Sequence, residues 1–376
     1  MSAEPIPSAL GDLRILDFSR VLAGPFATMM LADLGAEVIK VERPEIGDET
    51  RSWGPPNDAD GTATYFQAVN RNKRSIALDL SADAGRIRAQ ELAADADVIV
   101  ENFRPDVMDK LGLGYETLSV ANPRLVYCSI TGFGAGQGAR LPGYDLLVQA
   151  VGGLMSITGA PEGEPQKVGV AVVDVLAGLF ASVGILAALR HRDVTGTGQR
   201  LEVNLFSSLL AALVNQGSAY TVAGVVPGRM GNAHPSISPY ELYATGDGEL
   251  VLAVGNDRQF SALCEILEAP ELASDPRFDG NRNRVENRDE LKAQLLARLQ
   301  DRPASEWARL LTDARVPAGV VNDIAGAFEL ATALGMKPIV DVPGPDGSTV
   351  ALTRNPIGLQ RTPPTYRSAP PPLPED

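Results

Sequence analysis

A long apolar segment near the middle of the chain constrains its fold more than any other feature. The segment runs from Val175 to Arg190, is rich in Ala and Leu, and is followed by His191 and Arg192. Cations at this position match the negative end of a helix dipole, so we expect a helix here. Because the apolar part is shorter than the ~20 residues of a membrane span, we predict a buried core helix and no membrane partner.

Asp174 directly precedes this helix and is the only ionisable side chain between Lys167 and Arg190. The residues before it, 168–173, form a short β-branched run that predicts a buried strand. A carboxylate at such a junction has two interpretations. It caps the helix by accepting hydrogen bonds from first-turn amides, or it is a nucleophile at the edge of a core, where those amides stabilise developing negative charge.

The start of the chain has the pattern of a β-α-β unit. Apolar runs at 13–18 and 38–41 predict strands, and residues 23–35 predict a helix between them. Other segments extend this pattern, with strands expected at 75–78, 98–100, 125–130 and 201–206 and helices at 82–94 and 207–222. We therefore predict an α/β fold whose large domain is a Rossmann-like parallel sheet. No GxGxxG follows the first strand, so the scaffold does not imply a dinucleotide cofactor.

The second half of the chain predicts a smaller domain. Residues 225–249 are rich in Gly, Pro, Asn and Ser, which is typical of a long loop with a hairpin attached. A strand at 250–255 and helices at 259–267, 288–300 and 304–314 follow. We expect a large domain at 1–225, a small α+β domain at 226–327, and a C-terminal segment at 328–376 that returns to the large domain. The prolines of its last residues forbid regular structure, so this end should wrap a surface, either of its own chain or of a partner subunit.

Charge and cysteine content exclude several classes of function. Lys and Arg number 33 against 47 Asp and Glu, a net charge of −14, which argues against nucleic acid or an anionic membrane as the main partner. Cys128 and Cys264 each lie in an apolar run, as expected of buried thiols in a reducing compartment. With only two histidines, His191 and His234, we expect no metal site. The N-terminus has no signal-peptide pattern, so we expect a cytoplasmic protein.

Several motifs together resemble the class III coenzyme A transferases, a family that also contains the α-methylacyl-CoA racemases. The central motif is GYDLLVQAVGGLMSITG followed by PQKVGVAVVDVLAGLFASVGILAALRHRDVTGTGQ. LDFSRVLAGPFATMMLADLGAEVIKVERPEIGDETR, NRNKRSIALDL, VIVENFRPDVMDKLGLGYETL, GNAHPSISPY and NPIGL match in the same order along nearly the whole chain. The resemblance implies an interlocked homodimer, with coenzyme A as a substrate and no prosthetic group.

The resemblance also implies roles for individual residues. Asp174 corresponds to the catalytic carboxylate, and the coenzyme A site corresponds to Val21, Ala23, Arg43, Lys73, Asn102, Phe103, Arg104 and Lys110. Tyr144 and the loop residues Gly231, Asn232, Ala233 and His234 correspond to the substrate site and its lid. Two positions depart from the family pattern, because Leu22 and Thr131 stand where some members carry a Gln and a Lys near the thioester.

The expected reaction is transfer of coenzyme A from an acyl-CoA, of which succinyl-CoA is typical, to a carboxylic or dicarboxylic acid. The resemblance implies a covalent aspartyl-CoA thioester on Asp174, protected from water by a lid. A distal carboxylate on the substrate would need a cation, and Arg229 and Arg140 are the candidates.

Two alternatives use the same residues differently. A racemase needs an acid and a base on opposite faces of the substrate, and in that branch the second group resembles a His in a GHD motif. Here Tyr144 stands in its place, and a phenol that titrates near ~10 is a poor base at neutral pH. A non-enzymatic coenzyme A-binding protein would have no need of Asp174. Both observations favour the transferase.

Overall fold

The computed structural model describes residues 8–59 and 61–374, which form two compact units. Among the described residues, the larger unit contains 8–59, 61–154, 167–226 and 337–374, and the smaller contains 155–166 and 227–336. The smaller unit therefore extends past the expected boundary at 327 and includes a segment assigned above to the large domain. Arg229 explains the second difference, because it donates hydrogen bonds to the carbonyls of Ala160 (3.1 Å) and Gly163 (2.7 Å) and so ties 155–166 to this unit.

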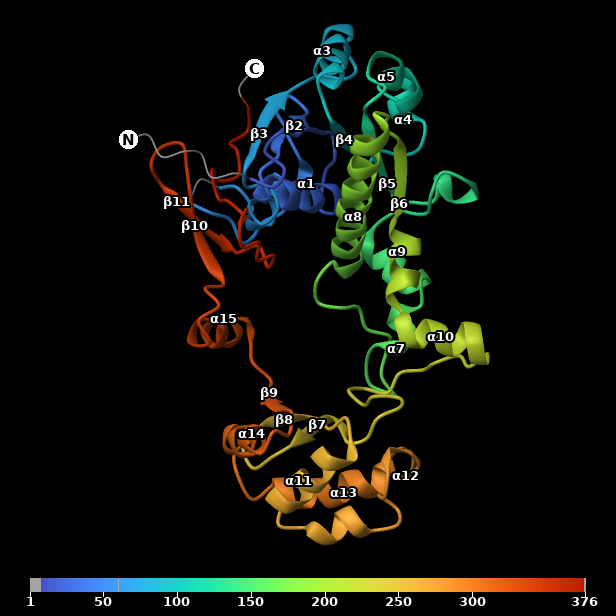
Figure 1. Cartoon of the computed structure of the whole chain (residues 1–376), viewed down its shortest axis with the longest axis vertical. Helices are drawn as coiled ribbons and strands as arrows, with labels where there is room; N and C mark the ends of the chain where they lie inside the picture. The colour runs from blue at the N-terminus through green and yellow to red at the C-terminus, as the bar shows by residue number, and fades with distance from the viewer. Residues whose placement is uncertain (1–7, 60, 375–376) are drawn as a thin grey trace. The chain divides into compact units, whose positions relative to one another are not determined.

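A six-stranded sheet forms the centre of the larger unit, with strand order β3-β2-β1-β4-β5-β6 and every pair parallel (Figure 1). The strands are β1 (Arg14–Asp17), β2 (Glu37–Glu42), β3 (Lys73–Ala77), β4 (Val98–Glu101), β5 (Val126–Thr131) and β6 (Arg200–Asn204). The predicted α/β fold with a parallel sheet is confirmed. The strand order reverses between β1 and β4. The loops that follow these two strands therefore run in opposite directions and leave a crevice at the carboxyl ends of the strands.

Helices cover both faces of this sheet because both faces are apolar. Ile15 faces one layer and Leu16 the other, and Val98 and Ile99 alternate in the same way. The first layer contains α1 (Ala23–Asp33), α8 (Val172–Thr195) and α9 (Leu205–Ala212), and the second contains α3 (Asp83–Ala94), α4 (Val107–Lys110) and α5 (Tyr115–Ala121). The remaining helices of the unit are short: α2 (Thr64–Gln67), α6 (Asp145–Val151), α10 (Val214–Ala223), η1 (Glu49–Ser52) and η2 (Gln137–Arg140). α7 (Leu154–Ile157) crosses the boundary between the units.

The helix expected at 207–222 is interrupted. α9 ends at Ala212 and α10 begins at Val214, which has a φ of 42°. A β-branched residue in the left-handed region cannot continue a right-handed helix, so the chain changes direction there.

The prediction of a strand at 168–173 is wrong. α8 already begins at Val172, and Val170 is largely exposed. The amide of Val168 donates to the side-chain oxygen of Gln149 (2.9 Å), so it satisfies its hydrogen bond without a neighbouring strand. Asp174 consequently lies in the first turn of α8, not at the end of a strand.

α8 is buried on one face only. It packs closely on α1, where a Cβ at Gly178 would lie 2.6 Å from the carbonyl oxygen of Ala23, so only glycine fits. Its other face exposes Leu179, Phe180, Val183 and Leu186, with Val183 65% exposed. Among the described residues it is the one helix long and apolar enough to span a membrane by length and composition, but its first face belongs to the core of the sheet. The prediction of a buried core helix therefore holds for one face of α8 only.

The C-terminal segment lies against its own large unit. It begins with a hairpin of β10 (Ile339–Pro343) and β11 (Thr349–Thr353) and continues without regular structure. Arg367 donates to the carbonyls of Ala32, Gly35 and Ala36, each at 3.0 Å, which caps the end of α1. This segment thus covers part of the larger unit of its own chain.

The smaller unit has a three-stranded antiparallel sheet, ordered β7-β8-β9, with helices on it. Its elements are β7 (Tyr240–Ala244), β8 (Glu249–Ala253), α11 (Asp257–Ile266), η3 (Pro270–Ser274), α12 (Asn281–Glu286), α13 (Arg288–Leu299), α14 (Ala304–Asp313), β9 (Ala318–Val320) and α15 (Ile324–Ala333). Phe260, Leu295 and Trp307 belong to a separate apolar core, so this unit has its own hydrophobic core.

Candidate active site

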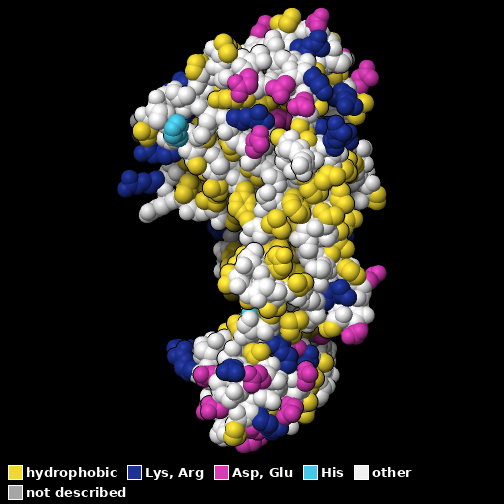
Figure 2. Space-filling model, turned by 90° about the vertical axis from the view of Figure 1, so that its right-hand side faces the viewer, with side chains coloured by type: hydrophobic (Ala, Val, Ile, Leu, Met, Phe, Trp, Pro, Cys, Tyr) yellow, Lys and Arg dark blue, Asp and Glu magenta, His cyan; other side chains and the backbone are white. Residues whose placement is uncertain are grey.

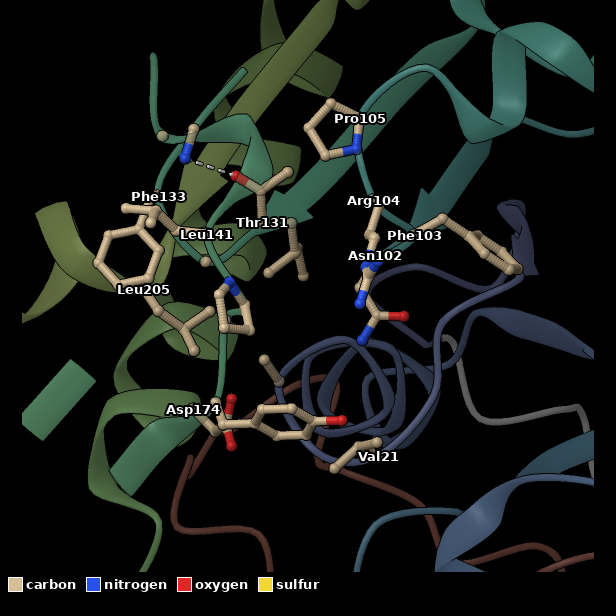
Figure 3. A pocket seen from close by; sticks show the side chains of 18 of the residues that line it. Val21, Asn102, Phe103, Arg104, Pro105, Thr131, Phe133, Leu141, Asp174 and Leu205 are labelled. Atoms are coloured by element: carbon tan, nitrogen blue, oxygen red, sulfur yellow. Dashed lines mark hydrogen bonds between the residues drawn. The ribbon is translucent and has the colours of Figure 1, made fainter. Parts of the chain in front are cut away.

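A cavity of about 200 Å³ lies at the carboxyl ends of the central strands of the larger unit. Its walls come from the loops that follow β1, β4 and β5 and from the first turn of α8, and Figure 3 shows Asp174 on a different side of it from Asn102, Phe103 and Arg104. Of the residues expected to bind ligand, the cavity brings together Val21, Ala23, Asn102, Phe103, Arg104, Tyr144 and Asp174. Ligands bind at this edge of parallel sheets, so this is the candidate active site.

Asp174 does not cap its helix. The capping carboxylate belongs to Asp145 in α6, whose Oδ1 accepts hydrogen bonds from the amides of Val173 (2.8 Å) and Asp174 (3.3 Å). Gln149 holds Asp145 in turn, by donating to its Oδ2 at 2.6 Å. The side chain of Asp174 is left free for a ligand in the cavity, so the capping interpretation of this residue is wrong.

The pKa of Asp174 is raised to about 7, first by burial and then by the negative charge of Asp145. In the described part of the chain no ion pair reaches either carboxylate within 4.0 Å. A carboxylate in this environment is more basic than an ordinary aspartate, which makes it a stronger nucleophile when ionised.

Two glycines bring the Tyr144 loop against the end of β5. A Cβ added at Gly132 would lie 2.4 Å from the Cα of Gly143, and the reverse is equally close. Only two glycines allow the two backbones to approach in this way. The contact fixes Tyr144 in the wall of the cavity, with its side chain 65% exposed, and places Asp145 at the start of α6.

The loop after β1 holds a strained residue in the cavity wall. Val21 has a φ of 69°, a left-handed conformation that is costly for a β-branched side chain. Its amide lies 3.3 Å from both carboxylate oxygens of Asp48. Asp48 is paired with Lys40 at 2.9 Å, and Lys40 also donates to the carbonyl of Ser19 at 2.8 Å. A fully buried ion pair therefore holds this loop in place.

Arg20 is a site residue that the sequence reasoning missed. It lines the cavity of Asp174 and also a second cavity of about 450 Å³. Its backbone exchanges two hydrogen bonds with the side chain of Asn102 (2.9 and 2.7 Å), and its guanidinium lies 5.2 Å from the centre of the Phe103 ring. The available signal was its position, one residue before Val21 in the motif SRVLAGP.

The second cavity has apolar walls and a polar rim. Phe18, Val41, Leu78, Leu80 and Leu111 supply the apolar part. Arg43 and Ser81 also line it, and the Arg43 side chain is exposed. A flat aromatic group with attached anions fits this combination, since the walls are apolar and a cation lies nearby.

Lys73 does not lie where a phosphate can reach it. Its ammonium group is fully buried and pairs with Asp17 at 3.1 Å, with further bonds to the carbonyl of Pro25 (2.9 Å) and the side chain of Asn70 (3.0 Å). Lys73, which was expected to bind coenzyme A, is thus engaged within the protein and lines neither of the two cavities. Arg71 is likewise buried against Asp33. Lys110 is exposed at the end of α4 and lines neither of the two cavities.

The expected lid residues belong to the smaller unit. The amide of Gly231 donates to the carbonyl of Gly159 at 3.1 Å. Asn232 and Ala233 follow in the same turn, and the ring of His234 accepts from the amide of Ser236 (3.1 Å) and lies 5.2 Å from the ring of Tyr240. Arg229 is engaged with backbone carbonyls, as described above. Arg140 is exposed at the end of η2 and is not among the residues lining the cavity of Asp174.

No group of His, Cys, Asp and Glu side chains arranged to hold a metal ion occurs within 8–59 and 61–374. Cys128 and Cys264 are free and buried.

Comparison with known proteins gives a consistent set of relatives. A family model described as CoA-transferase family III matches residues 10–376. Succinate–glutarate CoA-transferase of Agrobacterium fabrum is 45% identical over 97% of this chain and 93% of its own length. Succinyl-CoA:glutarate CoA-transferase of Homo sapiens is 45% identical over 85% of this chain and 73% of its own. The crystal structure of a CAIB/BAIF family protein from Brucella suis superposes with a TM-score of 0.86 and 43% identity, covering 97% of this chain and 96% of that one.

Proposed function

This chain belongs to CoA-transferase family III, and we propose that it exchanges coenzyme A between short dicarboxylic acids. A succinyl-CoA-like thioester is the donor and a dicarboxylate such as glutarate is the acceptor. The names of relatives that are 45% identical over most of the chain support this pair of substrates. The observation that carries the proposal is Asp174, a carboxylate with no cationic partner among the described residues, at the wall of the cavity formed by the strand ends.

The chemistry begins with ionised Asp174. One of its oxygens attacks the carbonyl carbon of the donor thioester, the carbon–sulfur bond breaks, and the coenzyme A thiolate leaves with the electron pair. The product is a mixed anhydride between Asp174 and the donor acid. The thiolate then attacks the Asp174 carbonyl carbon, the donor carboxylate leaves, and Asp174 becomes a coenzyme A thioester.

The second half repeats these steps in reverse order. The acceptor carboxylate attacks the Asp174 thioester, which forms a second anhydride and releases the thiolate again. The thiolate attacks the acyl carbonyl of the acceptor, giving the new acyl-CoA and the free carboxylate of Asp174. No step gains or loses a proton, so the cycle requires Asp174 as a nucleophile and no acid–base group. Because the anhydrides hydrolyse readily, the cavity must exclude water while they exist.

The two cavities give a route for the coenzyme A molecule. We place its nucleotide end in the apolar second cavity, with Arg43 near the phosphates, and its thioester beside Asp174. Arg20 and Phe103 line both cavities, so the connecting part of the ligand passes over them. Arg104 lines the cavity of Asp174 and is exposed, and it supplies a second cation for an anionic group of either substrate.

The racemase alternative has no supporting observation in this cavity. Its described lining contains Tyr144 but no histidine. A phenol is a poor base at neutral pH. The other carboxylate of the described lining, Glu49, is paired with Arg20.

We further propose that the subunit forms a homodimer through its apolar helical surface and acts in the cytoplasm. Figure 2 shows apolar side chains gathered over one face of the larger unit. Exposed apolar residues of the unit include Phe180 and Val183 on α8 and Tyr220 and Val222 on α10, the last 85% exposed. Apolar surface of this extent is typical of a protein interface. A monomer in sedimentation at micromolar concentration would contradict the dimer.

The nucleophile is tested by replacing Asp174 with alanine. Wild-type protein incubated with succinyl-CoA and no acceptor should gain the mass of coenzyme A on a peptide containing Asp174, and the variant should gain none. We expect Asp174→Ala to lower turnover at least ~1,000-fold while the protein remains folded. A variant that keeps a tenth of wild-type turnover, or a wild-type adduct on another residue, would remove Asp174 from this role.

A further inference from the structure

The carboxylate of Asp145 occupies the amino-terminal end of α8. Its Oδ1 accepts hydrogen bonds from the amides of Val173 and Asp174, at 2.8 and 3.3 Å. Its Oδ2 accepts from Gln149 at 2.6 Å, and the other end of the Gln149 amide accepts from Val168 at 2.9 Å. Gln149 is completely buried. The side chain of Asp145 is therefore fixed between α6 and α8 by three hydrogen bonds and a buried neighbour.

This arrangement reduces the number of free amides at the start of α8 that could bind the carboxylate of Asp174. Unoccupied amides and the positive end of the helix dipole normally stabilise a carboxylate in the first turn. Here Asp145 already accepts from two of those amides, so Asp174 is deprived of them. Asp145 also places a negative charge next to the nucleophile, which disfavours its ionised form.

On the basis of the function proposed above, we propose that Asp145 is a positioning residue for the nucleophile. By occupying the first amides of α8, it orients the first turn of the helix and keeps Asp174 a basic carboxylate. Asp145 does not need to touch the substrate for this role. Gln149 supports this role, because its hydrogen bond holds the side chain of Asp145 in the capping orientation.

Other titratable groups near the cavity could also act on the ionisation of Asp174. Tyr65 in α2 is close enough to Asp174 and Asp145 for their charges to act on it, and with burial as the larger cause they raise its pKa to about 12, so it stays neutral. Arg20, Glu49 and Arg104 line the same cavity. Glu49 is paired with Arg20 and so offsets its charge. Burial is the larger cause of the raised pKa of Asp174, and the charge of Asp145 is the second.

Two effects follow for the reaction. The ionised fraction of Asp174 should increase as pH rises through about 7. A more basic carboxylate also attacks a thioester faster once it is ionised, because nucleophilicity follows basicity within one type of group. Removing the charge of Asp145 should therefore increase activity at low pH and decrease it at high pH.

The decisive experiment is the pH dependence of kcat/KM for succinyl-CoA in wild type and Asp145→Asn. Asparagine is as good a helix cap as aspartate, so the amides of α8 keep an acceptor. The acid limb of the wild type should lie near pH 7, and in the variant it should move down by at least ~1 pH unit, with a lower plateau at pH 8. A variant whose plateau falls while its acid limb stays in place would overturn the proposal.

Two further variants separate this role from a structural one. Asp323→Asn makes the same exchange at the start of α15, where Oδ1 accepts from the amide of Gly326 at 2.8 Å, and it should leave the pH profile unchanged. Asp145→Glu restores the charge and should return the acid limb to the wild-type position. If Asp145→Asn fails to fold, Asp145→Ser keeps a capping oxygen without charge and makes the same test. Absence of the coenzyme A adduct on wild-type Asp174 would instead refute the proposed function, independently of these profiles.

Discussion

The larger unit contains two groups of carboxylates, one buried and one half-buried, that behave in opposite ways. In the first group, three buried carboxylates each have a cation within 3.1 Å: Asp17 with Lys73, Asp48 with Lys40, and Glu42 with Arg51. At the start of α8, Asp174 and Asp145 face each other with no ion pair among the described residues. Burial would raise the pKa of Asp17 and Asp48, but the lysines beside them hold it below its usual value, whereas the pKa of Asp174 rises to about 7.

The difference shows that the partner, more than the depth of burial, decides what a carboxylate does. A paired carboxylate is held ionised and fixes geometry, as the Lys40–Asp48 pair does for the strained loop at Val21. An unpaired one keeps its reactivity, because neither charge nor hydrogen bonds neutralise it. Structural and chemical functions are thus divided between two adjacent groups of acids.

The largest change in stability should come from removing the charge of a carboxylate that is paired with a buried lysine. Asp17→Asn leaves Lys73 buried without its counter-ion, and we expect the free energy of unfolding at pH 7 to fall by ~3–5 kcal/mol. Because the folded pKa of Asp17 is lowered, its contribution is present above its unfolded pKa of 3.8 and is lost as pH falls through the folded pKa. Urea unfolding at pH 7 and at a series of pH values below 3.8 measures both effects. Asp346→Asn, at an exposed turn residue, is the control. An equal loss of stability in both variants would show that pairing with Lys73 gives Asp17 no special role.

Removing the charge of the unpaired carboxylate, Asp174, should have the opposite effect and increase stability. Asp174→Asn should raise the free energy of unfolding at pH 8 by ~1–3 kcal/mol, since it removes a charge that the fold disfavours. The folded pKa of Asp174 is raised from 3.8 to about 7, so its favourable contribution is complete below 3.8 and is lost as pH rises through about 7. The gain should therefore disappear at pH 4. Thermal unfolding of wild type and variant across this range measures it, and a variant less stable than wild type at pH 8 would contradict the comparison.

The smallest effect should come from a cation that has no carboxylate partner. Arg43 lines the second cavity, and no ion pair involves it in the described part of the chain. Arg43→Ala should raise KM for succinyl-CoA ~5- to 10-fold with little change in kcat, because it removes a contact made equally in ground and transition states. Lys110→Ala, a cation outside both cavities, should change KM less than twofold. Equal effects of the two substitutions would show that net charge, not the cavity, attracts the ligand.

Much of the framework was predictable because it depends on local pattern. Alternating apolar runs placed the strands of the parallel sheet, and loops after β1 and β4 then had to meet at one edge, which brought Val21 and Asn102 into one cavity. The strand expected at 168–173 failed because β-branched residues also occupy the first turn of α8, where hydrogen bonds from other elements hold the backbone. Periodicity over six residues does not separate these two cases.

The sequence by itself determined the alternation of strands and helices and the isolation of one carboxylate, Asp174, at the start of a long apolar helix. Only the tertiary structure decided which charged groups are neutralised. Lys73 meets Asp17 across 56 positions of sequence, and Asp145 reaches the amide of Val173 across 28. A side chain's pKa depends on its burial and on charges within a few ångströms, and these distances exist only after the chain has folded.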